Sequence, residues 1–98
     1  MKVKLTVMKV PDIGEYAEVP LELNYSGPCL SFKVGQEIIV NGEDKPEGFC
    51  IYAWNALWPY IMTLGRGGEF SDMYKASGKM FACCPDAARP VAFLIERI

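Results

Sequence analysis

The chain has 98 residues and a net charge of −2, and 51% of its residues are hydrophobic. This length predicts a single domain, residues 1–98. The ten basic and twelve acidic residues are spread along the chain, which argues against nucleic-acid binding. The sequence has no histidine, which excludes Ser–His and Cys–His catalysis, histidine-ligated zinc and a two-histidine iron site.

The N-terminal segment bears on the cellular location of the protein. It alternates charged and apolar residues and lacks the uninterrupted apolar stretch of a signal peptide. We therefore expect a cytoplasmic protein with reduced thiols. The longest apolar run, Pro46–Gly68, is too short and too interrupted to span a bilayer, so no membrane association is expected.

The first half of the chain predicts two strands separated by loops. Alternation of apolar and polar residues over Lys2–Val10 is typical of a half-buried strand. Pro11–Pro20 predicts an exposed loop, and Leu21–Tyr25 fits either a short strand or a turn of helix. β-Branched residues in Gln36–Val40 predict the second strand. The residues expected to point inward from the first strand are Val3, Leu5 and Val7.

The longest apolar run predicts the main helix of the chain, over Phe49–Leu64. Pro46 suits the start of this helix and Gly65 suits its C-cap. A proline inside a helix removes a hydrogen bond and clashes with the preceding turn. We therefore expect a kink or a break near Trp58, with Pro59 opening a second short helix.

This predicted helix is apolar on two faces. Helical spacing gathers one set of residues on the first face: Cys50, Ala53, Trp54, Leu57, Ile61 and Leu64. The opposite face carries Ile51, Tyr52, Asn55, Trp58 and Met62. A helix that is apolar all round is buried on more than one side, so a second layer or a partner subunit is expected to cover it. The large apolar fraction of the chain also favours a homo-oligomer.

The last quarter of the chain predicts two more strands, Lys79–Cys84 and Val91–Arg97. The second is apolar on both faces, which indicates a central position or an edge covered by a partner. The order strand, strand, helix, strand, strand predicts an α+β fold. We expect a small antiparallel or mixed sheet of about four or five strands, with one main Pro-kinked helix packed on one face.

The four cysteines are the most unusual feature of the sequence. Cys29 follows a Gly-Pro turn, Cys50 opens the helix, and Cys83 and Cys84 end a strand. Their spacing matches no zinc-finger, zinc-ribbon or ferredoxin pattern. Strand ends and helix starts can nevertheless converge at one end of a sheet. The set therefore indicates a zinc or iron–sulfur site, a redox-active thiol set, or simply small buried hydrophobic residues.

Within this set, Cys50 is the best candidate for a reactive thiol, because a helix N-terminus stabilises the thiolate form. Its place on the same helix face as Leu57 and Leu64 favours burial instead. An intramolecular disulfide is a further alternative. A bond between the adjacent Cys83 and Cys84 is not expected, because it would strain the backbone.

Other polar features have a structural and a functional interpretation. Backbone N–H groups of Gly65–Gly68 can bind an anion, but such a run more commonly forms the turn that ends a helix. Asp72 and Asp86 lie in predicted turns, where aspartate commonly caps its own backbone rather than acting as an acid or base. Arg89 is placed to pair with Asp86. Aromatic residues that can line either a ligand pocket or the core are Tyr52, Trp54, Trp58 and Tyr60.

Several segments, in order from Gly27 to the C-terminal end, form a recognisable pattern. They are Gly27-Pro28-Cys29, Phe32-Lys33-Val34-Gly35-Gln36-Glu37, Pro46-Glu47-Gly48-Phe49-Cys50, Leu57-Trp58-Pro59, Gly67-Gly68, Cys84-Pro85-Asp86, Pro90-Val91 with Phe93, and Ile95-Glu96-Arg97. This pattern resembles a family of small, uncharacterised prokaryotic proteins of about this length, whose activity is not established. The resemblance implies that Cys29, Cys50 and Cys83 or Cys84 belong to the family pattern. Members often carry a histidine just before the Lys-x-Gly, where this chain has Phe32; that departure weakens a four-ligand metal site.

These observations favour a non-enzymatic, homo-oligomeric binding or accessory domain. We expect it to bind a protein or small-molecule partner through the surface around the helix start and the Cys84-Pro85-Asp86 turn. The alternative is a metal-binding, iron–sulfur or thiol redox accessory protein that uses Cys29, Cys50, Cys83 and Cys84. A third reading is a cysteine-dependent enzyme with Cys50 as nucleophile and a carboxylate or lysine as base.

Overall fold

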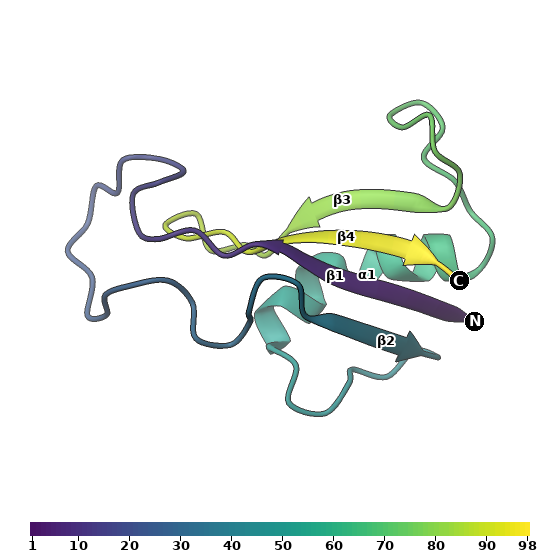
Figure 1. Ribbon diagram of the computed structural model, residues 1–98, viewed down its shortest axis with the longest axis horizontal. Coiled ribbons are helices and arrows are strands. Elements are labelled where there is room, and N and C mark those ends of the chain that lie inside the picture. The colour runs from purple at the N-terminus through teal and green to yellow at the C-terminus, as the bar shows by residue number, and fades with distance from the viewer.

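A computed structural model describes all 98 residues of the chain as one helix packed on a four-stranded antiparallel sheet (Figure 1). In chain order the elements are β1 (Lys2–Lys9), β2 (Glu37–Asn41), α1 (Ile51–Gly65), β3 (Lys79–Cys83) and β4 (Ala92–Arg97). The strands are ordered β2-β1-β4-β3 across the sheet. The predicted α+β fold is therefore confirmed. Leu21–Tyr25 forms neither a strand nor a helix.

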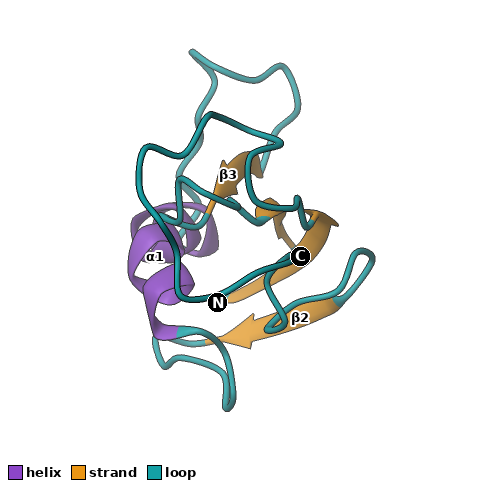
Figure 2. Cartoon of the chain, turned by 90° about the vertical axis from the view of Figure 1, so that its left-hand side faces the viewer, coloured by secondary structure: helices purple, strands orange, loops and turns teal.

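The core lies between one face of the sheet and α1, which Figure 2 shows on one side of the strands. The residues predicted to point inward from β1, Val3, Leu5 and Val7, are fully buried, and so are Phe93 and Ile95 from β4. Strand β4 lies between β1 and β3, which is the first of the two positions that its apolar faces allowed. Each large aliphatic side chain buried in this way contributes roughly 1.5–3 kcal/mol through the hydrophobic effect.

The helix runs through Pro59 as one element, so the predicted second helix is wrong. Pro59 has no N–H to donate to the carbonyl oxygen of Asn55, and both residues lie on the exposed side of α1. Water can therefore satisfy the Asn55 carbonyl. Leu57 and Ile61, which flank the proline on the inner face, are fully buried and hold both halves of the helix against the sheet.

The two ends of α1 also differ from the prediction. The helix begins at Ile51 rather than near Pro46, because the preceding residues form a turn in which the Phe49 N–H donates to the Pro46 carbonyl (3.1 Å). Lys45 Nζ holds that turn by donating to the Phe49 carbonyl (2.8 Å). Cys50 is consequently the N-cap residue, and its side chain makes no capping hydrogen bond.

At the C-terminal end, Gly65 is the last helical residue and Arg66 is the C-cap. Gly67 follows with φ 90° and donates its N–H to the Leu64 carbonyl (3.0 Å). The Gly68 N–H donates to the Thr63 carbonyl (2.8 Å), which completes a Schellman motif. The Gly65–Gly68 run thus forms a turn that ends the helix, which is the commoner role of such a run.

One side of α1 stays uncovered by the rest of the chain. Ile51, Tyr52 and Trp58 are 50%, 72% and 41% exposed, whereas Met62 from the same predicted face is buried. No second layer of the chain covers these residues. That a partner subunit covers them stays a prediction. No helix of the chain combines the length and the apolar character needed to cross a membrane.

Candidate functional site

A cavity of about 420 Å³ lies at the end of the sheet where β3 ends, β4 begins and α1 starts. We call it the thiol cavity, because three of the four cysteines line it. Its walls are mostly apolar. The residues that line it are Tyr25, Cys29, Ser31, Phe32, Cys50, Tyr52, Cys84, Pro85, Asp86, Arg89 and Val91. The predicted binding surface around the helix start and the Cys84-Pro85-Asp86 turn coincides with this cavity.

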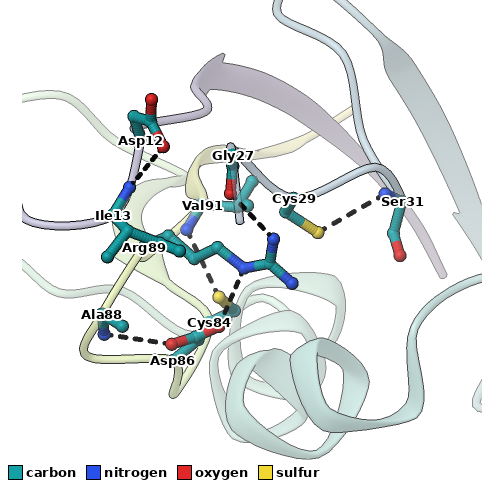
Figure 3. Close-up of polar contacts among 10 residues, drawn as sticks. All are labelled: Asp12, Ile13, Gly27, Cys29, Ser31, Cys84, Asp86, Ala88, Arg89 and Val91. Atoms are coloured by element: carbon teal, nitrogen blue, oxygen red, sulfur yellow. Dashed lines mark hydrogen bonds and ion pairs between the residues drawn. The ribbon is translucent and has the colours of Figure 1, made fainter. Parts of the chain in front are cut away.

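The three thiols reach the cavity from distant parts of the sequence. Cys29 lies in the loop between β1 and β2, Cys50 at the start of α1 and Cys84 just after β3. All three are partly buried and none forms a disulfide. The Cys29 sulfur accepts a hydrogen bond from the Ser31 N–H (3.4 Å), and the Cys84 sulfur accepts one from the Val91 N–H (3.3 Å), as Figure 3 shows.

Cys83 does not join this group, so convergence of all four cysteines is wrong for this residue. Successive residues of an extended chain point to opposite sides. Cys83 is exposed and lines a different cavity, next to Tyr16 and Phe81. Partial burial, with a smaller contribution from the neighbouring Cys84 thiolate, raises the pKa of Cys83. A raised pKa disfavours the thiolate that would attack an electrophile or bind a metal.

The metal hypothesis gains no support from this geometry. No group of three or more histidine, cysteine, aspartate or glutamate side chains is placed to hold a metal ion. Zinc binding needs several sulfur ligands at about 2.3 Å from one ion. Zinc or an iron–sulfur centre on Cys29, Cys50, Cys83 and Cys84 stays a prediction.

Arg89 is the charged group that organises the cavity. Its Nε donates to the Asp86 Oδ2 (3.3 Å), which confirms the predicted pair, and its Nη1 donates to the Gly27 carbonyl (3.0 Å). The guanidinium carbon lies 4.1 Å from the centre of the Tyr25 ring, a cation–π contact. The Asp86 Oδ1 also accepts the Ala88 N–H (3.0 Å), the backbone cap expected of a turn aspartate.

These contacts fix the direction of the guanidinium. Arg89 joins the β3–β4 turn to Gly27, 62 residues away in the sequence (Figure 3). Only 18% of its side chain is exposed. The third nitrogen, Nη2, makes no hydrogen bond within the chain. The cavity therefore combines apolar walls with one oriented cation that has a free donor.

The other aromatic candidates divide between the cavity, the core and the surface. Tyr52 lines the thiol cavity. Trp54 is buried in the core. Trp58 borders a separate surface pocket next to Pro59. Tyr60 packs edge-on against Phe70, with ring centroids 5.9 Å apart. The other predicted acid–base candidate, Asp72, is exposed and makes no side-chain hydrogen bond or ion pair.

Several lining residues were not predicted as site residues. Phe32 is almost fully buried and packs edge-on against Phe93, with centroids 5.1 Å apart, so it belongs to the core as well as to the cavity wall. Val91 was predicted only as the first residue of the last strand. Tyr25 and Ser31 lie in a loop, where no periodicity signals which side chains turn inward. The lining residues that the sequence did single out were the three cysteines, Tyr52, Asp86 and Arg89.

Comparison of the chain with family models, with curated proteins and with solved structures finds no match. The resemblance to a family of small prokaryotic proteins stays a prediction. The function is therefore argued from the cavity.

Proposed function

We propose that this domain binds a small organic anion in the thiol cavity and that it is a binding protein rather than an enzyme. The observation that carries the proposal is the free Nη2 of Arg89, held in direction by Asp86 and Gly27 in an otherwise mostly apolar cavity. Ligand sites typically combine apolar walls with a few oriented polar groups. Charge-assisted hydrogen bonds from arginine suit carboxylates.

The walls indicate what the rest of the ligand looks like. The exposed rings of Tyr25 and Tyr52 present apolar surface to the cavity, and the nearly fully buried Phe32 and Val91 line it from the core side. A flat apolar or aromatic body with one carboxylate would bury against these side chains and place its charge at Arg89. Asp86 partly balances the charge of the guanidinium, which favours a ligand with a single negative charge over a highly charged one.

A catalytic role for the cysteines has less support. The Cys29 and Cys84 sulfurs accept hydrogen bonds from backbone N–H groups, and Cys50 makes no side-chain hydrogen bond. A nucleophilic cysteine needs a base within hydrogen-bond reach. No carboxylate or lysine hydrogen-bonds to any of these three thiols.

The test is an NMR titration with small aromatic carboxylates, each compared with its neutral amide. We expect the acids to shift the amide signals of Cys29, Cys50 and Val91 and to bind several-fold more tightly than the amides. Arg89→Met should remove that preference, whereas Arg66→Met, at an exposed arginine outside the cavity, should not. If no acid perturbs the cavity amides, or if acids and amides bind alike, the proposal is wrong.

A second candidate, thiol redox chemistry, rests on the presence of three free thiols around one cavity. In this reaction two thiols would lose two electrons and two protons to form one disulfide, while hydrogen peroxide is reduced to water. Limited peroxide treatment followed by peptide mass spectrometry tests it. A disulfide between two of Cys29, Cys50 and Cys84 would favour this role. Sulfinic acids or random pairing with Cys83 would contradict it.

A further inference from the structure

The two edges of the sheet differ in how their backbone groups are satisfied. Strands β2 and β3 form these edges (Figure 1). Just outside the ends of β3, the Cys84 N–H donates to the Val91 carbonyl (3.0 Å), and the Arg97 N–H donates to the Gly78 carbonyl (2.8 Å). Hydrogen-bonded pairs alternate along an antiparallel ladder, so Phe81 directs its N–H and C=O away from β4.

A side chain blocks the β3 edge at this point. The Tyr74 hydroxyl donates to the Phe81 carbonyl (3.1 Å) and accepts the Phe81 N–H (3.4 Å). Both outward groups at the centre of the strand are therefore occupied within the chain. An incoming strand cannot pair there without displacing Tyr74.

The β2 edge has no such protection. The Val7 N–H donates to the Gln36 carbonyl (2.9 Å), and the Gly42 N–H donates to the Met1 carbonyl (3.3 Å). By the same alternation, the three residues that direct their N–H and C=O groups away from β1 are Glu37, Ile39 and Asn41. No other hydrogen bond of the chain uses these outward groups. Ile39 is also 47% exposed, although it is a large hydrophobic residue in a sheet.

We propose that β2 pairs antiparallel with β2 of a second copy of the chain, around a twofold axis at Ile39. The strand reads Glu-Ile-Ile-Val-Asn, which is self-complementary in this register. Ile39 would face the partner's Ile39, and Glu37 would face the partner's Asn41. The two sheets would then join into one continuous sheet of eight strands.

Three features make a second copy the occupant that fits best. The outward backbone groups of Glu37, Ile39 and Asn41 all fall on hydrogen-bonded pairs in this register, so every one finds a partner. No like charges lie opposite each other, and the exposed Ile39 side chains meet at the axis. The same edge pairs on both copies, which closes the assembly at a dimer. No β2 residue lines the thiol cavity, so this proposal does not depend on ligand binding.

The first test compares the two edges by sedimentation equilibrium from micromolar to near-millimolar concentration. Wild-type protein should dimerise, and Ile39→Lys should be monomeric with an unchanged circular dichroism spectrum. The matched control is Phe81→Lys, because Phe81 is similarly exposed (52%) at the centre of the blocked edge. This variant should still dimerise. A wild-type protein that stays monomeric, or a dimer lost in Phe81→Lys and kept in Ile39→Lys, overturns the proposal.

A charge test at Asn41 separates the interface from the fold. Within the chain Asn41 lies opposite Lys2, and in the dimer it would face the partner's Glu37. Asn41→Glu should therefore stabilise the monomer slightly and weaken the dimer, whereas Asn41→Lys should do the reverse. Each substitution acts at two symmetric pairs, so the dissociation constant should change roughly 2- to 30-fold in opposite directions. Equal effects of both variants on the dimer would contradict this register.

Discussion

Glu69 and Arg97 form an ion pair that ties the segment after α1 to the last strand. Arg97 Nη2 lies 2.5 Å from Glu69 Oε1. Arg97 Nη1 also donates to the Leu64 carbonyl (2.9 Å) and to the Gly68 carbonyl (2.8 Å), both of which lie close to the C-terminal end of α1. Glu69 accepts hydrogen bonds from the Ser77 hydroxyl (2.6 Å) and the Gly78 N–H (2.8 Å). One carboxylate and one guanidinium thus join the helix end, the loop before β3 and the end of β4.

This arrangement predicts a dependence of stability on pH. Hydrogen bonds from Ser77, Gly78 and Arg97 lower the pKa of Glu69 from 4.5 to about 2. A carboxylate with a lowered pKa contributes stability that is fully present above pH 4.5 and is lost as the pH falls toward about 2. We expect Glu69→Gln to lower the unfolding free energy at neutral pH and to flatten its decline in this acid range.

The measurement is urea denaturation at a series of pH values. The control is Glu47→Gln, which neutralises an exposed carboxylate that makes no hydrogen bond or ion pair. Because Glu69 lies at the surface, solvent screening keeps the effect modest. An identical acid profile for wild type and Glu69→Gln would show that this pair does not act through the charge of Glu69.

Pro59 predicts a substitution that stabilises the protein. Pro59→Ala would supply the N–H that the Asn55 carbonyl lacks and would remove the clash of the ring with the preceding turn. We expect the unfolding free energy to rise by about 1–3 kcal/mol. Pro59→Gly restores the same N–H but adds backbone freedom, so it should gain about 1 kcal/mol less than alanine. Thermal and urea unfolding of the three proteins measure this, and a loss of stability in Pro59→Ala would contradict it.

Arg89→Lys should lower the free energy of unfolding because of the shape of the guanidinium rather than because of its charge. Arg89→Lys keeps the positive charge but cannot donate to both Asp86 and Gly27 in the planar geometry of a guanidinium, nor stack in the same way on Tyr25. We expect the unfolding free energy to fall by about 1–2 kcal/mol. Arg66→Lys, at an exposed arginine paired with Glu43, should change it by about 0.5 kcal/mol or less. Equal stability of wild type and Arg89→Lys would show that the tether contributes nothing.

Cys83 and Cys84, although adjacent in the sequence, should differ in their rates of alkylation. Burial and the Cys84 thiolate raise the pKa of Cys83, so its alkylation rate should rise at a higher pH than that of a small free thiol. A ligand in the thiol cavity should slow the alkylation of Cys84, which lines that cavity, and leave Cys83 unaffected. Peptide mass spectrometry after pulses of iodoacetamide measures both rates. Equal protection of the two cysteines would contradict their separation.

The sequence by itself determined the elements and the faces they bury. Alternation placed Val3, Leu5 and Val7 on one side of β1, and helical spacing placed Leu57 and Ile61 on the inner side of α1; all five are fully buried. Such patterns are local, because the strand and helix periods act over a few neighbouring residues. The pairing of Asp86 with Arg89 was visible for the same reason, since the two residues lie three positions apart.

Only the tertiary structure decided how these elements meet. The sequence alone did not indicate that Asn55 and Pro59 would both lie on the exposed side of α1, where the helix continues through the proline. Nor did it show that Arg89 would reach Gly27, or that Cys84 would join Cys29 while Cys83 turned away. It also could not show that Tyr74 would block one edge of the sheet. The Arg89–Gly27 and Cys29–Cys84 proximities depend on segments distant in the sequence that packing brings together, and the rest depend on how a loop or helix face is packed, which no local period encodes.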